Sequence, residues 1–278
     1  MGSQLSSVKA LMLIAAASSL LATVGVTSAA VIASDNAGGY TGAITTGLNS
    51  GTGFGAWQVG TGGGAAGTYL DTSGKNIATN KQSWGVYANT PSNGGTPRVD
   101  LTRTFNSALT AGDSFSVAMQ TDNIGSSGDF GFSLQTSNPI NQFTFAYDGT
   151  KGYDNMSIAD GSNGGSEYQA PSPGINFTDV NNGIIVTFTL VTANSYDLTV
   201  SPAPGNSNFS TVNLITNGTL SGGTISQVDL FDSNTSGNGY FNSLVISNSA
   251  PVPEPASLAM LGTGALGLLA LPRRKRTA

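Results

Sequence analysis

The 278-residue chain has no histidine and no cysteine, so its chemistry must come from carboxylates, amides, hydroxyls and aromatic rings. Without these two residue types it cannot build a Ser-His-Asp triad, a cysteine nucleophile, a disulfide or a His/Cys zinc site. Charged residues make up 9% of the chain, against about 25% in an ordinary soluble domain. This composition is typical of an exported all-β protein and argues against a cytosolic α/β enzyme.

Carboxylates alone can hydrolyse glycosides, but the reaction needs two of them flanking the scissile bond. Glu167 is the only glutamate between residues 31 and 250, and no Glu-x-Asp-x-x-Glu pattern places two carboxylates on one strand. We therefore predict that the protein is not an enzyme. A carbohydrate-active enzyme of unfamiliar type is the alternative.

Calcium is the one cofactor that the sequence suggests, because hard cations prefer carboxylates and loop carbonyl oxygens. Asp160 and Glu167 bound the best linear candidate, a Gly-, Ser- and Asn-rich loop without the spacing of an EF-hand. Asp122 and Asp129 flank a second candidate loop, and residues 229–238 form a third. In each case the alternative interpretation is an ordinary solvated turn.

Aromatic residues offer a second kind of site, since exposed rings stack on sugars. The candidates for glycan stacking are Trp57, Trp84, Tyr87 and Tyr168. Trp84 and Tyr87 lie in a strand-like run, so burial in the core is the alternative for both.

The segment from residue 31 to residue 250 is distinctly acidic. It contains five cations and fourteen acids, a net charge of −9, whereas the basic C-terminus brings the whole chain to −5. An acidic surface without a basic stripe repels nucleic acid and anionic lipid. We expect no nucleic-acid partner.

The N-terminal 30 residues have the pattern of a secretory signal peptide. Lys9 precedes a mostly apolar run from Ala10 to Val26, and small residues follow it directly. We predict cleavage by signal peptidase near Ala29 or Ala30. An N-terminal membrane anchor is the alternative, although the run is short for a span.

The C-terminal residues 251–278 combine a short motif, an apolar run and a basic cluster. The motif is Pro253, Glu254 and Pro255, the uncharged run covers residues 256–271, and the cluster is Arg273, Arg274, Lys275 and Arg276. A helix with this basic end should insert with the cations left in the cytoplasm.

This C-terminal segment resembles the PEP-CTERM sorting signal. The resemblance implies a Gram-negative source, a transient anchor in the inner membrane, processing by an exosortase, and transfer to the cell surface or the extracellular polysaccharide matrix. An ordinary single-pass tail anchor is the alternative.

Between these two segments, residues 31–250 carry the period-two alternation of antiparallel strands. Phe130, Phe132 and Leu134 alternate with polar residues in one run, and Phe143, Phe145 and Tyr147 do so in another. We predict an all-β domain, a jelly-roll-type antiparallel β-sandwich of eleven or twelve strands, flanked by a signal helix and a sorting helix. It resembles sandwiches of the concanavalin/laminin-G type.

Two segments of this domain stand out. Residues 183–191 are almost continuously apolar and β-branched, which predicts a central strand covered on both faces. Residues 34–67 are very rich in glycine, and we expect a first strand followed by a long, loosely packed loop.

The function expected from these features is that of an exported surface or extracellular-matrix protein. Its non-catalytic sandwich is expected to bind extracellular polysaccharide, a partner inferred from the sorting family and the fold class. A purely structural matrix protein is the alternative, and an enzyme is the third.

Overall fold

The protein is described here from a computed structural model, over residues 29–89, 95–122, 125, 128–151, 156–170 and 175–248. Most of the predicted signal peptide, and the whole sorting signal at 251–278, lie outside the described residues. Residues Ala30–Ser249 form a compact unit of their own.

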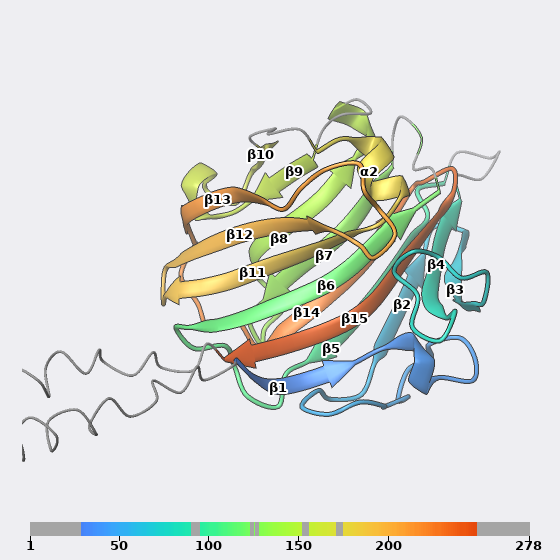
Figure 1. Ribbon diagram of the computed structural model, residues 1–278, viewed down its shortest axis with the longest axis horizontal. Helices are drawn as coiled ribbons and strands as arrows, with labels where there is room; N and C mark the ends of the chain where they lie inside the picture. Colours follow the sequence, from blue (N-terminus) through green and yellow to red (C-terminus); the bar gives the residue numbers. More distant parts are fainter. Residues whose placement is uncertain are drawn as a thin grey trace, which may run out of the picture. The chain divides into compact units, whose positions relative to one another are not determined.

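The larger of two antiparallel sheets has eight strands and lies in front in Figure 1. In spatial order its main path is β13 (Val212–Thr219), β12 (Ser195–Pro202), β11 (Ile184–Thr192), β6 (Asp113–Thr121), β15 (Asn238–Asn248), β4 (Ser83–Asn89) and β3 (Ala65–Asp71). The first strand, β1 (Ala30–Asp35), pairs with β15, so the two ends of the domain lie side by side.

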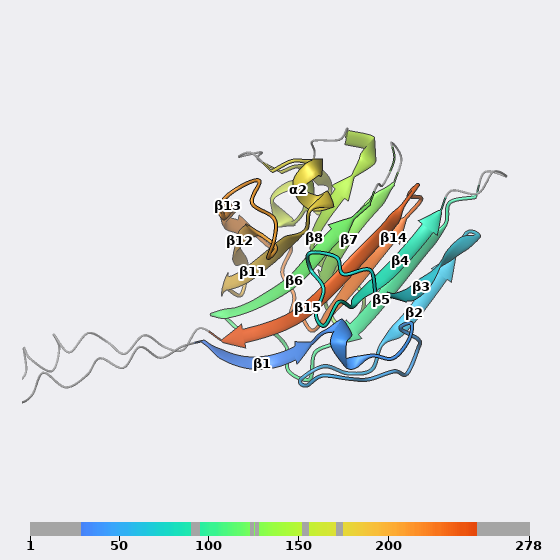
Figure 2. The ribbon, with the colours of Figure 1, turned by 45° about the vertical axis from the view of Figure 1, so that its right-hand side comes forward.

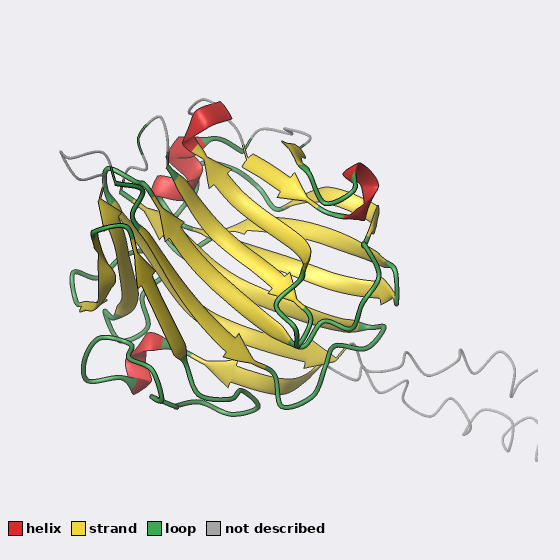
Figure 3. Ribbon diagram, turned by 180° about the vertical axis from the view of Figure 1, so that it is seen from behind, coloured by secondary structure: helices red, strands yellow, loops and turns green. Residues whose placement is uncertain are grey.

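The second sheet has seven strands and is seen from its outer side in Figure 3. Its order is β10 (Glu167–Gln169), β9 (Met156–Ala159), β8 (Asn141–Asp148), β7 (Asp129–Gln135), β14 (Gln227–Ser233), β5 (Arg98–Thr104) and β2 (Gln58–Gly62). Figure 2 shows the two sheets as stacked layers, which confirms the predicted all-β sandwich.

The fifteen strands of the described residues exceed the eleven or twelve expected. The extra strands are short: β10 has three residues, β9 has four and β2 has five. A segment such as Glu-Tyr-Gln is too short to show a period-two pattern, so its pairing comes from the neighbouring strand and not from its own sequence.

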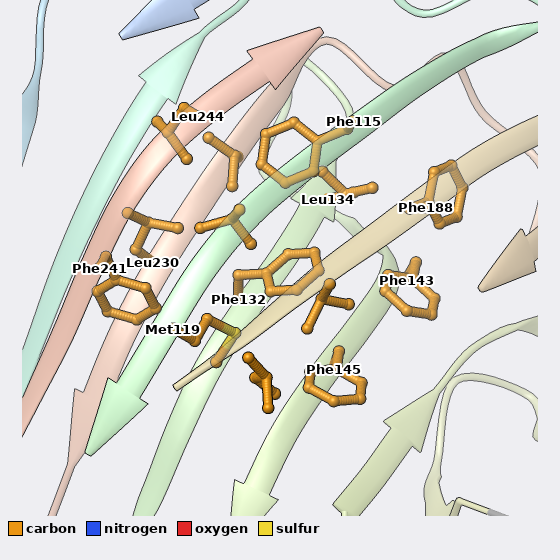
Figure 4. Close-up of a cluster of buried hydrophobic side chains, with 14 of the residues drawn as sticks. Phe115, Met119, Phe132, Leu134, Phe143, Phe145, Phe188, Leu230, Phe241 and Leu244 are labelled. Carbon is orange, nitrogen blue, oxygen red and sulfur yellow. The ribbon is translucent and has the colours of Figure 1, made fainter. Parts of the chain in front are cut away.

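Alternate residues of both sheets meet between the layers and form the core. Phe188 of β11 packs against Phe143 of β8 with ring centroids 5.1 Å apart, and Phe115 of β6 packs against Phe132 of β7 at 5.6 Å. Figure 4 shows these rings between the strands. Each contact joins one sheet to the other, so these rings hold the two layers together.

Strand β11 is central in its sheet but covered on one face only. Phe188 and its neighbours at i±2 are buried, whereas Thr187 and Thr189 are partly exposed and Val191 is 37% exposed. The prediction of a strand covered on both faces was therefore wrong. Ile185 makes the run look continuously apolar because it packs on a small separate cluster on the outer side.

The glycine-rich segment after β1 is packed and not loose, contrary to the prediction. Tyr40, Phe54 and Trp57 are all buried, and the loop folds around the fully buried side chain of Arg103. The Arg103 guanidinium forms an ion pair with Asp35 and donates to the Gly55 carbonyl at 2.7 Å. The buried cation thus anchors this segment together with the buried aromatic rings.

Helical structure is confined to single turns in the described residues. The longest is α2 (Phe177–Asn181), which is capped by Asn176 and Asp179. None of the described helices has the length and apolar character that crossing a membrane requires.

Candidate functional site

The two tryptophans proposed for glycan stacking are core residues. Trp57 is 0% exposed, and its indole nitrogen donates to the Tyr40 hydroxyl at 2.8 Å. Trp84 is 1% exposed and contacts Trp57 with ring centroids 5.4 Å apart. Both rings face other side chains, so neither presents a surface to a sugar.

Tyr87, the third candidate, lies on the outer face of the eight-stranded sheet, where the structure pairs it with Tyr69. The register places Tyr87 of β4 opposite Gly67 of β3, and Tyr69 of β3 opposite Gly85 of β4. The two tyrosines are partly exposed, and their ring centroids are 6.4 Å apart with an interplanar angle of 43°.

Both rings lie over a glycine of the neighbouring strand. A Cβ on Gly85 would come within 2.4–2.5 Å of three atoms of the Tyr69 ring, and a Cβ on Gly67 within 2.7–3.1 Å of three atoms of Tyr87. Only glycine permits this close approach. Each ring therefore rests with one face on the sheet, which leaves the opposite face for a ligand.

A third tyrosine, Tyr240, lies beside Tyr69 and next to the ion pair of Lys75 and Asp122. Tyr240 of β15 meets Tyr69 edge-on at 6.3 Å, and its hydroxyl donates to Asp122. The Lys75 ammonium lies 4.2 Å from the centre of the Tyr240 ring and 2.7 Å from Asp122. Burial, followed by the bond to Asp122, raises the pKa of Tyr240 to about 12. Tyr240 itself is only 3% exposed. We therefore call the two partly exposed rings, Tyr87 and Tyr69, the tyrosine strip.

In the best linear calcium candidate, the loop from Asp160 to Glu167, the aspartate is already hydrogen-bonded to other groups of the protein. The Asp160 carboxylate is buried and accepts from the Tyr196 hydroxyl at 2.6 Å and the Tyr168 hydroxyl at 3.0 Å. It also caps the 3-10 turn Gly161–Asn163 through Ser162. Glu167 at the other end of the loop is exposed. Asp160 therefore has the environment of a structural cap. The Tyr168 hydroxyl donates its hydrogen bond to this carboxylate.

The second calcium pair is split between the two sheets. Asp122 follows β6 and pairs with Lys75, whereas Asp129 begins β7 in the other sheet. Among the described residues no group of three or more carboxylates is placed to hold a metal ion. Calcium binding therefore stays a prediction, and the described residues contain no preformed site for it.

The outer face of the seven-stranded sheet carries two carboxyl pairs that sequence reasoning missed. Asp129 of β7 lies directly opposite Asp148 of β8, and burial and then Asp148 raise the pKa of Asp129 to about 7. Burial and then Asp100 likewise raise the pKa of Asp229 to about 7. Arg98 lies 2.7 Å from Asp100 and 3.8 Å from Asp229. We call the four aspartates the carboxyl face.

Burial, together with the positions of these aspartates on neighbouring strands, accounts for the raised pKa values. Asp129 and Asp148 lie directly opposite each other, and Asp229 and Asp100 lie on the paired strands β14 and β5. Two carboxyl groups this close together suit a shared proton or a bound cation.

A further aspartate, Asp232, points between the sheets. It lies opposite Val99 and Phe130, is fully buried, and neither carboxylate oxygen has a hydrogen-bond partner. The nearby Thr235 hydroxyl donates to the Gly237 carbonyl at 3.0 Å instead. Burial raises the pKa of Asp232 to about 7.

These raised pKa values predict that the domain is most stable in mild acid. The folded state holds a proton more tightly than the unfolded chain, whose aspartates titrate near 3.9. The stabilisation is complete below about pH 4 and is lost as the pH rises through about 7. Asp232→Asn should remove this loss and raise stability at pH 8 by about 1–3 kcal/mol.

Urea denaturation of wild type and Asp232→Asn at pH 5 and pH 8 measures this effect. Asp197→Asn is the control, because that partly exposed aspartate lies on the other sheet. Equal stability of the wild-type domain at both pH values would contradict the assignment.

Residues 251–275 match the family model described as the PEP-CTERM protein-sorting motif. The C-terminus is a PEP-CTERM signal. The match confirms the resemblance drawn from Pro253, Glu254 and Pro255 and the basic cluster. A PEP-CTERM signal implies an exported exosortase substrate with a transient membrane anchor.

Comparison of the chain with curated protein sequences gave no match. Among solved structures, a chain from work on endo-acting O-glycanases of human gut microbiota is 12% identical, with a TM-score of 0.49, covering 80% of this chain and 100% of that one. The T. cruzi calreticulin globular domain is 12% identical, with a TM-score of 0.45 and coverages of 77% and 94%. The cellulose induced protein Cip1 is 13% identical, with a TM-score of 0.43 and coverages of 68% and 90%. Similarities this distant carry no argument about this chain.

Proposed function

We propose that this exported protein acts at the cell surface or in the extracellular matrix, where its β-sandwich binds polysaccharide without cleaving it. The binding surface is the tyrosine strip. The observation that carries the proposal is the placement of Tyr69 and Tyr87, each with one ring face resting on a glycine and the other left for a ligand.

The chemistry of the strip suits a sugar ring. Aromatic faces attract the apolar faces of pyranose rings, and Tyr hydroxyls at the ring edges can bond to sugar hydroxyls. Two rings across adjacent strands extend the contact beyond a single point. Lys75 and Asp122 at the end of the strip add a polar contact beside the third ring.

The charge of the domain narrows the class of polysaccharide. With a net charge of −9 between residues 31 and 250, the domain disfavours polyanionic chains. A neutral polysaccharide is therefore the proposed ligand of the strip.

A glycan array with the folded domain tests the proposal. Replacing both Tyr69 and Tyr87 by alanine should weaken binding of the best neutral glycan about tenfold or more, because each aromatic contact contributes about 0.5–1.5 kcal/mol beyond its buried area. Tyr168→Ala is the matched control, since the hydroxyl of that partly exposed tyrosine donates to Asp160. Undiminished binding by the double variant would overturn the role of the strip. An array without any binding would favour the purely structural alternative.

The sorting signal leads to a separate prediction in the native host. Replacing Arg273, Arg274, Lys275 and Arg276 by alanine should impair membrane retention and exosortase processing, because the cations hold the cytoplasmic end of the apolar run. Pulse-chase labelling with cell fractionation measures the kinetics of processing. A variant that reaches the surface at the wild-type rate would show that the basic cluster is dispensable.

A further inference from the structure

One end of the sandwich carries both ends of the domain's chain. β1 begins at Ala30, which pairs with Asn248 at the end of β15. In Figure 1 the arrowheads of β11 and β15 point to this end, and β1 starts beside the tip of β15. Residues 249–255 then lead to the apolar run of the sorting signal. Seven extended residues span at most about 25 Å, so this end stays close to the membrane while the anchor holds.

Four turns close the sandwich at the same end, which we call the exit end. They cover residues 105–112, 136–140, 193–194 and 220–226. Asp113, which follows the first turn, pairs with Asn248 and so places the turns beside the end of β15. The last turn is bonded to the other three: Ile225 accepts from Leu109, Ser226 donates to Gln135 and Leu220 donates to Asn194, all at 2.9 Å.

Exposed apolar side chains gather at the exit end. The described residues contain five large hydrophobic side chains that are exposed, and four of them lie here: Val31, Ile32, Ile140 and Val191. Val31 and Ile140 are the most exposed, at 63% and 62%. Between the turns, a hollow of about 180 Å³ has Leu109, Leu190 and Ile225 in its wall. Exposed apolar residues that gather in one place mark an interaction surface, whereas scattered ones do not.

The exit end also lacks the charges that the opposite end carries. None of the four turns contains an acid or a base, and Asp113 beside them is buried. Glu167 and Asp197 lie on sheet positions outside the turns. The opposite strand ends carry Arg98, Asp122, Asp129 and Asp148. An anionic lipid surface repels a domain of net charge −9, so the uncharged exit end is the part best suited to approach it.

We propose that the exit end rests on the phospholipid membrane surface while the sorting signal anchors the protein, with Val31, Ile140 and Val191 in the boundary between headgroups and acyl chains. Binding at a membrane surface grows with the apolar area that enters this boundary. The polar side chains and backbone of the turns stay hydrated among the headgroups. The contact therefore fixes how the domain is oriented before an exosortase releases it.

This orientation points the tyrosine strip away from the bilayer. Tyr87 pairs with Asn238 at the start of β15, and the chain leaves the domain at Asn248. A strand of this length spans about 30 Å. The strip thus faces the extracellular side of the anchored protein. The membrane contact does not depend on sugar binding by the strip, and its test needs no sugar.

Quenching of a fluorescent label by membrane lipids tests the orientation. The chain has no cysteine, so one introduced cysteine carries the label at a chosen place. Ser107→Cys at the exit end and Ser236→Cys at the opposite end are a matched pair, since both serines are exposed. The protein, with its sorting signal, is inserted into vesicles of phosphatidylethanolamine and phosphatidylglycerol that contain a spin-labelled lipid. We expect the label at 107 to be quenched and its emission to shift to shorter wavelength, and the label at 236 to show neither effect.

A charged variant separates the surface contact from the effect of the tether. Ile140→Glu with Val191→Glu should fold, because both side chains are exposed, yet it should lose the quenching of the label at 107. Ser207→Glu with Ser210→Glu is the matched control: it adds the same charge to exposed positions of the loop between β12 and β13, at the opposite end, and should keep the quenching. Urea denaturation checks that both variants are folded.

Three results would overturn the membrane contact. Equal quenching at 107 and 236 would mean that the anchored domain has no preferred orientation. Full quenching in the Ile140→Glu, Val191→Glu variant would mean that the tether alone brings the exit end to the bilayer. An equal loss in the Ser207→Glu, Ser210→Glu control would mean that added charge acts wherever it is placed.

Discussion

Replacing Arg103 by methionine should lower the free energy of unfolding by about 3–5 kcal/mol. Removing one partner of a buried ion pair leaves the other charge unpaired, which is the costly way to break it. Here the loss would leave the Asp35 carboxylate without its cation. Burial raises the pKa of Asp35 even though Tyr40 and Arg103 lower it. It would also free the Asn49 and Ser50 oxygens, which accept from the guanidinium at 2.6 Å.

Chemical denaturation of the domain measures this loss, and Arg98→Met is the matched control. The Arg98 side chain is 44% exposed, and exposed ion pairs contribute about 0–1 kcal/mol. We expect the glycine-rich loop after β1 to become susceptible to proteolysis in Arg103→Met, because Arg103 is its anchor. If both variants lose the same small amount, the buried pair does not hold the loop.

Replacing Phe188 by alanine should also cost about 3–5 kcal/mol, through the cavity left between the sheets. The Phe188 ring is fully buried and contacts Phe143 at 5.1 Å and Tyr196 at 5.0 Å. It joins β11 to β8, so its loss weakens the contact between the layers and not only within one of them.

Thr187→Ala is the control for this experiment, because Thr187 is the next residue of β11 and points to the outer face. Its loss should change stability by less than about 0.5 kcal/mol. Urea denaturation again gives both values. A loss below about 1 kcal/mol for Phe188→Ala would show that β11 is peripheral to the core.

The alternating strands were predictable from the sequence because their buried residues recur with period two. Phe130, Phe132 and Leu134 face the core as expected. The assignment of strands to sheets was not predictable, since β7 pairs with β14, a strand about a hundred residues away in the chain. The carboxyl face depends on this register, which no local pattern encodes.

The candidate site was predictable in part. Tyr87 was proposed and Tyr69 was missed, although both belong to a Gly-x-Tyr pattern, Gly67-x-Tyr69 and Gly85-x-Tyr87. In an antiparallel pair this pattern puts each tyrosine opposite the other strand's glycine. Arg103 has the same parity as the buried Val99, Leu101 and Phe105, so the alternation indicated its inward direction, but the ion pair that permits its burial could not be foreseen. Its partner Asp35 lies in another strand, and only the folded chain brings the two together.

The most direct test of the central claim is nuclear magnetic resonance of the domain with the neutral oligosaccharide that binds best on the array. The tyrosine strip predicts intermolecular Overhauser contacts between sugar ring protons and the ring protons of Tyr69 and Tyr87, with those sugar protons shifted upfield by the aromatic rings. Contacts from a bound oligosaccharide to other parts of the domain, with none to Tyr69 or Tyr87, would contradict the account.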